Sequence, residues 1–153
     1  MKNIYSVLFF LYLNFNCYAQ KDVFSQLNNN WIKLTTVNNE VVIYNPCAAE
    51  NQSFTVIDQE DKNILAYHWG QQSSFHQIIL ILELTNGIKA KLDDGSEIEL
   101  VEFDTQKNIY KLHWSDNQNT EILSILFTNE KNRGNFKIVN QPCTDCWQLE
   151  DCN

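Results

Sequence analysis

The chain has 153 residues, with 11 lysines and arginines against 19 acidic residues and a formal net charge of −8 at pH 7. Arg133 is the only arginine, and the chain lacks a basic stripe that could displace counterions from a phosphate backbone, which argues against binding to nucleic acid. The sequence motifs of serine hydrolases, zinc proteases, phosphate-binding loops and dinucleotide sites do not occur, so we predict a non-enzymatic protein with no cofactor.

Residues 1–19 have the pattern of a signal peptide. Lys2 precedes a largely apolar stretch, and the small residues Cys17 and Ala19 suit cleavage after position 19. The apolar stretch has about 12 residues, whereas a membrane span needs roughly 20. We therefore expect an exported protein, periplasmic or secreted, with no membrane span and with a single domain at residues 20–153.

A lipoprotein with its anchor on Cys17 is the alternative interpretation of the leader. Lipid attachment requires a small residue directly before the cysteine, and Asn16 is bulky and polar, which disfavours this alternative. Cleavage after Ala19 would remove one lysine and no acid, giving a mature charge of −9. A protein this acidic would attract basic partners.

The mature chain is predicted to start with a short helix near Asp22 to Leu27 and to continue as short strands between polar turns. The strand segments are rich in β-branched and aromatic residues, and none contains a proline. Their predicted ranges are 31–37, 40–45, 53–58, 63–69, 76–85, 88–92, 97–103, 108–114, 120–128 and 135–139. These ranges indicate an all-β, antiparallel meander of about 8–10 strands, closed or nearly closed into a barrel so that few edges are exposed.

Two features of the strand region concern its turns and its symmetry. Asn86-Gly87 and Asp94-Gly95 are typical hairpin dipeptides, in which we expect the glycine to have a positive φ. Residues 62–69 and 107–114 match at five of eight positions, including a shared His-Trp pair. The match indicates either two related halves of one barrel or a chance similarity between two hairpins.

Four cysteines remain after the leader, namely Cys47, Cys143, Cys146 and Cys152. An even number in an exported chain predicts two disulfides, for which three connectivities exist. A proline precedes both Cys47 and Cys143, so each of these cysteines lies just beyond a strand end. We favour a bond from Cys47 to the C-terminal tail, which closes a loop of roughly 100 residues and contributes about 4–5 kcal/mol in the chain-entropy model.

The Cys143-x-x-Cys146 spacing has two other interpretations. A thioredoxin-like redox pair would lie where a strand leads into a helix, whereas this pair lies in the last eleven residues. A zinc site shared with Cys47 would contain only one Cys-x-x-Cys pair, in an oxidising compartment. Both interpretations are weaker than a structural disulfide.

Alternation along the strands assigns the aromatic and histidine side chains to two faces. Trp69 shares a face with Tyr67, and Trp114 shares a face with Tyr110, and both faces are apolar and predicted to point inward. His68 then shares a face with Ile64 and Ala66, and His113 shares a face with Ile109 and Lys111, which places both histidines on the outer face. The predicted ligand-binding residues are Tyr67, Trp69, His76, Tyr110 and Trp114, and their alternative role is structural, as core residues or as a histidine at a strand end.

His76 has the same parity as Ile78, Leu80, Leu82 and Leu84, so all five are predicted to point inward. Ile79 and Ile81 would then form an outer apolar face, which Trp147 and Leu149 of the tail could cover.

The densest acidic cluster comprises Asp93, Asp94, Glu97 and Glu99. Calcium prefers such oxygen ligands, but the spacing matches no EF-hand, and acidic hairpin tips are usually only solvated. We predict no metal site here.

The order of signal peptide, short helix, first-strand tryptophan (Trp31), strand meander and disulfide-tied tail resembles the calycins, meaning lipocalins and related small barrels. The chain departs from the lipocalin signature, since Asn29 replaces its glycine and Arg133, the only candidate for its arginine, precedes the last predicted strand. The resemblance concerns layout and transfers no ligand-binding residue.

Two functions follow from these observations. The first is a lipocalin-like barrel that binds a small apolar or aromatic ligand inside. The second is an acidic protein-interaction module, for example an inhibitor or immunity protein that recognises a basic exported hydrolase.

Overall fold

The computed structural model describes residues 27–47, 50–60 and 62–142. Three predicted features lie outside the described residues: the leader, the predicted N-terminal helix except for Leu27, and the tail that contains Cys143, Cys146, Trp147, Leu149 and Cys152. Predictions about those segments therefore stay predictions.

The described part of the chain consists mainly of β-strands, as the sequence predicted. In chain order it contains β1 (Trp31–Val37), β2 (Glu40–Asn45), β3 (Ser53–Gln59), β4 (Lys62–His68), β5 (Ser73–Leu84), β6 (Gly87–Leu92), β7 (Glu97–Asp104), β8 (Ile109–Ser115), β9 (Glu121–Asn129), the 3₁₀ helix η1 (Glu130–Asn135) and β10 (Ile138–Asn140).

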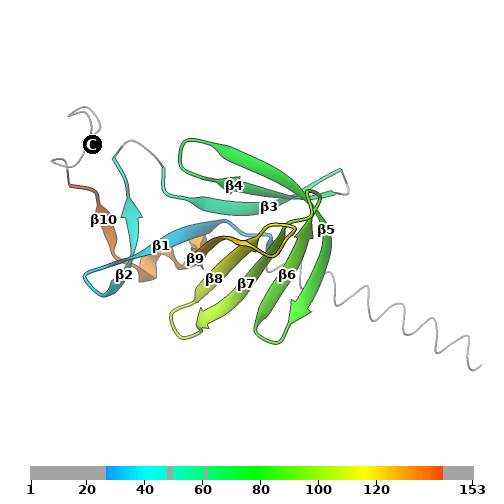
Figure 1. The fold of residues 1–153 in the computed structure, drawn as a ribbon. Helices are drawn as coiled ribbons and strands as arrows, with labels where there is room; N and C mark the ends of the chain where they lie inside the picture. Colours follow the sequence, from blue (N-terminus) through cyan, green and yellow to red (C-terminus); the bar gives the residue numbers. More distant parts are fainter. Residues whose placement is uncertain (1–26, 48–49, 61, 143–153) are drawn as a thin grey trace, which may run out of the picture.

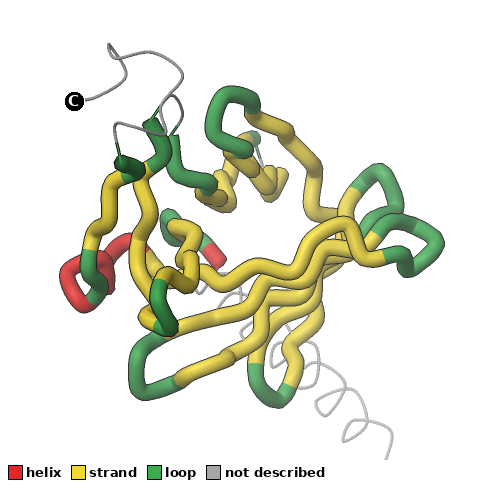
Figure 2. The backbone as a smooth tube through the Cα atoms, turned by 60° about the vertical axis from the view of Figure 1, so that its left-hand side comes forward, coloured by secondary structure: helices red, strands yellow, loops and turns green. Residues whose placement is uncertain are grey.

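Eight of these strands form a closed antiparallel barrel in the order β1-β3-β4-β5-β6-β7-β8-β9. β9 closes the ring by pairing with β1, from Trp31 opposite Asn129 to Leu34 opposite Leu126. Figures 1 and 2 show the strands encircling one interior. Closure leaves these strands without open edges, which confirms the barrel predicted from sequence.

β2 and β10 lie outside the ring. β2 pairs with the far end of β1, and β10 pairs with β2 in parallel, from Ile138 opposite Ile43 to Asn140 opposite Asn45 (Figure 1). The prediction of a purely antiparallel sheet ending in a strand at 135–139 was therefore wrong in this detail. The 3₁₀ helix η1, capped by the Asn129 side chain that accepts from Lys131 N, separates β9 from β10.

The interior of the barrel is filled by apolar and aromatic side chains. Trp31 stacks on Phe54 at a centroid distance of 5.6 Å, and Phe127 meets Phe54 edge-on at 5.0 Å. Leu27 is the first residue that the structure describes, and its side chain is fully buried in the same cluster. Burial of so many large side chains supplies the main favourable free energy of folding.

A β-bulge in β5 corrects the predicted orientation of its leucines. Ile78 pairs with Leu92, but the next partners are Leu80 and Lys91, so one extra residue is inserted at Ile79. The insertion reverses the alternation along the strand. Ile78 is buried, whereas Leu80 and Leu82 are 45% and 47% exposed on the outer face, opposite to the prediction that they line the interior.

The turns satisfy their geometry in three different ways. Asn38 and Asn39 both have positive φ in the two-residue β1–β2 turn, which asparagine tolerates better than most residues. Gly95 has the predicted positive φ of 85°. Gly87 is instead the first residue of β6, and a Cβ there would lie 2.1 Å from the Leu100 carbonyl oxygen, so this glycine is required by close packing and the prediction of a positive φ was wrong.

Candidate functional site

A cavity of about 270 Å³ opens at the end of the barrel where β6 and β8 begin. Apolar walls come from β1, β6, β7 and β8, and a polar rim comes from the segment before β1 and from the β9–η1 junction. The lining residues are Asn29, Trp31, Gly87, Ile88, Leu100, Tyr110, Asn129, Lys131 and Asn132.

Trp31 is one of the apolar residues that line this cavity. It is 4% exposed, stacks on Phe54 and meets the Tyr110 ring edge-on at 5.0 Å. Its indole N–H is buried and makes no hydrogen bond within the part of the chain that the structure describes. An unsatisfied buried donor costs about 1–3 kcal/mol, so an acceptor that reached the indole would recover this free energy.

The rim of the cavity has cationic and amide character. Lys131 is the one charged residue among its described lining residues. The Asn129 side chain accepts from Lys131 N and thereby fixes the backbone at the start of η1. The pKa of the Tyr110 hydroxyl is raised, first by burial and second by the charge of Glu102, so Tyr110 remains a neutral donor at physiological pH.

Close backbone packing forms the floor of the cavity. Gly87 lies directly against Leu100 and Val101 of the neighbouring strand, and it lines the cavity beside Ile88. A side chain at position 87 would displace the β7 backbone. The absence of that side chain lets β6 and β7 approach closely where the cavity begins.

The opposite end of the barrel carries a cluster of four aromatic rings. Tyr67 lies 4.3 Å from Trp69 and 5.5 Å from Trp114 between ring centroids, and His76 meets Trp114 edge-on at 5.1 Å. Tyr67 and Trp114 are buried, whereas Trp69 is 39% exposed and lies at the rim. Burial raises the pKa of the Tyr67 hydroxyl well above its ordinary value, so this group stays protonated.

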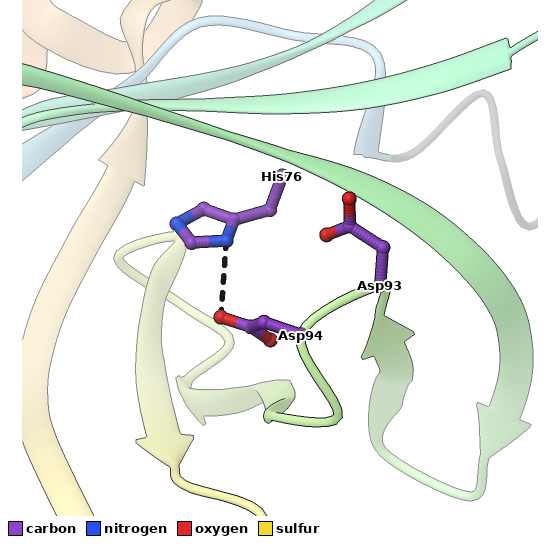
Figure 3. Close-up of side chains that lie close together, drawn as sticks. All are labelled: His76, Asp93 and Asp94. Carbon is purple, nitrogen blue, oxygen red and sulfur yellow. Dashed lines mark ion pairs between the residues drawn. The ribbon is translucent and has the colours of Figure 1, made fainter.

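His76 connects this aromatic cluster to the acidic β6–β7 turn. Its Nδ1 lies 3.2 Å from Oδ2 of Asp94, and Asp93 lies beside them (Figure 3). Because Leu65, which is fully buried, is the cross-strand partner of His76, the histidine lies on the inner face, as predicted. The sequence singled out both His76 and the acidic turn, but gave no sign that they are in contact.

The predicted ligand-binding residues thus divide between the two ends of the barrel. Tyr67, Trp69, His76 and Trp114 form one cluster, and Tyr110 lies at the other end beside the cavity. Trp31, Ile88, Leu100 and Lys131, which also line the cavity, were not predicted as ligand-binding residues. Only Trp31 had a sequence signal, as the first-strand tryptophan. The other three could not be found from sequence, because a cavity depends on which strand ends converge.

His68 and His113 lie on the outer face, as predicted. Nδ1 of His68 lies 2.7 Å from Oγ of Ser73, and Nδ1 of His113 lies 3.4 Å from Oε2 of Glu121. Both are therefore surface histidines with polar neighbours.

No protein-family model matches the chain, and neither the curated proteins nor the solved structures provide a significant match. The resemblance to lipocalins stays a prediction: Arg133, the only candidate for the lipocalin arginine, pairs with Glu130 at 2.9 Å, while Trp31 packs on Phe54 and Tyr110. Within the described ranges, no helix has the length and apolar character required to cross a membrane.

Proposed function

We propose that this protein binds a small ligand, partly apolar and carrying a hydrogen-bond acceptor or an anionic group, in the cavity beside Trp31. The single observation that carries the proposal is the mostly apolar cavity lined by Trp31, whose indole N–H is buried without a hydrogen bond among the described residues, with Lys131 at the cavity rim. Such a combination of apolar walls with a few polar groups is typical of small-molecule sites.

The size of the cavity limits the ligand. Drug-sized ligands occupy pockets of roughly 300–1,000 Å³, and this cavity of about 270 Å³ lies just below that range. The rest of the interior is filled by buried side chains such as Phe54, Tyr67 and Phe127. The ligand therefore enters at one end of the barrel and does not occupy the centre.

A panel of small aromatic compounds tests this proposal. We expect benzoate and phenylacetate to bind more tightly to the purified protein than benzyl alcohol does, and benzylamine to bind least, when binding is measured by calorimetry. Trp31→Phe keeps the aromatic wall and removes the donor, so it should weaken benzoate binding by roughly three- to tenfold, the equivalent of one hydrogen bond.

A matched control is available at the other end of the barrel. Trp69→Phe also replaces a tryptophan by phenylalanine, but Trp69 lies in the aromatic cluster and does not line the cavity, so this variant should leave benzoate binding unchanged. Equal loss of binding in both variants, or no binding by any member of the panel, would contradict the proposal.

An acidic protein-interaction module is the alternative function. The outer face of β5 exposes Phe75, Ile79, Leu80 and Leu82, and exposed apolar patches often mark protein interfaces. The net charge of the whole chain is −8, which favours a basic partner, and the exposed face of β5 favours a partner with an apolar patch of its own.

The alternative predicts that one basic exported protein is captured by this chain, that its capture weakens as salt increases, and that Phe75→Ser abolishes it. Phe103→Ser is the matched control, because Phe103 on β7 is similarly exposed. Capture that is insensitive to salt, or that is reduced equally by both substitutions, would rule out this interface.

We further infer that the protein is exported and that Cys47 is bonded to Cys143. The export proposal rests on the leader sequence. For the disulfide, Gln141 N donates to the Asn45 carbonyl at 2.8 Å, and Cys47 N donates to Oε1 of Gln141 at 3.1 Å. The parallel β2–β10 pairing thus continues to Cys47 on one side and to Pro142, the residue before Cys143, on the other.

Mass spectrometry of the protein from the exported fraction tests both inferences. We expect an N-terminus at Gln20 and, after digestion without reductant, a linked peptide pair that contains Cys47 and Cys143. A retained leader or a lipid on Cys17 would refute the proposed processing, and a Cys47 peptide linked to Cys146 or Cys152 would refute the proposed connectivity.

A further inference from the structure

Three potential metal ligands converge at the barrel end that lies opposite the cavity. They are an imidazole nitrogen of His76 and one carboxylate oxygen each from Asp93 and Asp94, and these three atoms all lie within 4.8 Å of one another (Figure 3). β6 begins at Gly87 in the wall of the cavity and ends at Leu92, directly before the two aspartates, so the two sites lie at opposite ends of one strand.

The fold brings the ligands together from two separate segments. His76 lies near the start of β5, on its inner face, and the aspartates lie in the β6–β7 turn. Asp93 N donates to the Gln77 carbonyl at 2.9 Å, and Gln77 N donates to Oδ1 of Asp93 at 3.2 Å. This reciprocal pair ties the acidic turn to the residue next to His76.

Each ligand is also oriented by a further contact. Oδ1 of Asp94 accepts from Ser96 N at 2.9 Å and from Ser96 Oγ at 2.6 Å, which leaves Oδ2 to face His76. Trp114 donates its indole N–H to Ser96 Oγ and packs edge-on against the His76 ring. Contacts of this kind fix ligand orientation in natural metal sites, where losing one lowers metal affinity by roughly 10–100-fold.

The distances and the donor types suit a transition metal. Two ligands at about 2.1 Å from a tetrahedral ion are separated by roughly 3.4 Å, close to the 3.2 Å between Nδ1 of His76 and Oδ2 of Asp94. Imidazole nitrogen together with carboxylate oxygen favours ions such as Zn²⁺ over Ca²⁺ and Mg²⁺, which prefer oxygen ligands alone. The partial exposure of His76 and Asp94 leaves room for water to complete the coordination.

We propose that His76, Asp93 and Asp94 form a binding site for one divalent transition-metal ion, with Zn²⁺ as the reference ion. The site differs from an ordinary acidic hairpin tip because a histidine from a different strand provides the third ligand. It is also independent of the cavity beside Trp31, since the two share no residue.

Calorimetric titration of the purified full chain with Zn²⁺, without reductant, tests the site. We expect one high-affinity Zn²⁺ per chain that a large excess of Ca²⁺ does not displace. Co²⁺ should bind in its place and give a visible absorption spectrum that reports nitrogen and oxygen ligands. Displacement by Ca²⁺, or a cobalt spectrum with sulfur-ligand bands, would overturn the proposal.

Variants assign the ligands. His76→Ala should reduce Zn²⁺ affinity by more than the roughly 10–100-fold expected for an orienting residue, and Ser96→Ala should reduce it within that range. His113→Ala is the matched control. His113 also lies near a carboxylate, that of Glu121, but among the described residues it does not belong to a group of three potential metal ligands. This variant should leave the affinity unchanged.

Asp94→Asn keeps the shape of the turn and guards against a folding defect in the histidine variant. It should lower Zn²⁺ affinity without changing the far-ultraviolet circular dichroism spectrum. Zn²⁺ binding that survives both His76→Ala and Asp94→Asn, or that falls equally in His113→Ala, would refute this site.

Discussion

The rings of Trp69 and Trp114 stack at the barrel end opposite the cavity, with their centroids 6.0 Å apart and an interplanar angle of 29°. These residues occupy matching positions in the two similar segments 62–69 and 107–114. β4 and β8 are four strands apart in either direction around the eight-stranded ring, so they lie opposite each other. The two similar segments are thus arranged like two halves of one barrel, which agrees with an internal repeat.

Filling the cavity should abolish ligand binding without unfolding the protein. Ile88→Phe adds volume to the cavity wall, and overpacking of this kind costs about 1–3 kcal/mol. Ile98→Phe makes the same change in the same core at a residue that does not line the cavity. We expect the two variants to lose similar free energies of unfolding in urea, but only Ile88→Phe should lose benzoate binding. Loss of benzoate binding in both variants would argue that binding merely follows stability.

Gly87→Ala should be strongly destabilising. The new Cβ would lie 2.1 Å from the Leu100 oxygen and 2.7 Å from the Val101 Cα, and neither backbone atom can move without disturbing β7. We expect the free energy of unfolding to fall by more than about 2 kcal/mol, as for other severe steric changes. Gly134→Ala is the control, because a Cβ there meets no atom within 4 Å. An equal effect of the two substitutions would refute close packing at Gly87.

The bulge at Ile79 places Leu82 on the outer face, so its truncation should differ in effect from that of a core leucine. Leu112→Ala removes a fully buried side chain and should lower the free energy of unfolding by about 2–5 kcal/mol. Leu82→Ala, on the exposed outer face, should change it by about 0.5 kcal/mol or less. Comparable losses for both residues, measured by urea unfolding, would place Leu82 in the core and argue against the bulge.

Lys89 should stabilise the barrel over a defined pH window. It lies 2.7 Å from Glu97 and 3.0 Å from Glu99, and its hydrogen bonds, first with Glu97 and then with Glu99, raise its pKa above 10.5. The hydrogen bond from Lys89 lowers the pKa of Glu97 below 4.5. The contribution of Glu97 is lost as pH falls through its lowered pKa, and that of Lys89 is lost as pH rises through its raised pKa.

Lys89→Met tests this window. At neutral pH the substitution should cost about 0.2–1 kcal/mol per ion pair, because both partners are partly exposed to solvent. The difference in unfolding free energy between the two proteins should shrink at acidic and at strongly alkaline pH. A difference that stays constant across the whole pH range would mean that Lys89 acts through packing of its aliphatic stem.

Local sequence was sufficient to predict most of the barrel. Strands β1 and β2 have the predicted bounds, and the bounds of β3 to β9 differ from prediction by a few residues at their ends. The reason is that side-chain alternation, β-branched residues and turn residues act within a few positions of the chain. For the same reason, the outer positions of His68 and His113 followed from strand parity alone.

The pairing of strands decided what the sequence could not. The bulge at Ile79 reversed the parity of Leu80 and Leu82, since the register of β5 depends on β6 and not on β5 itself. The parallel pairing of β10 with β2 likewise joins segments that are far apart in the sequence, so no local pattern could predict it.

The candidate sites depend on contacts between distant segments even more than the strand pairing does. The sequence by itself determined an acidic, strand-rich chain with a leader-like start, an aromatic inner face and an acidic turn at Asp93 and Asp94. Only the tertiary structure placed His76 against that turn and Trp31 beside a cavity at the opposite end. Strand propensity is a local property, whereas a cavity or a ligand cluster exists only where barrel closure brings separate strand ends together.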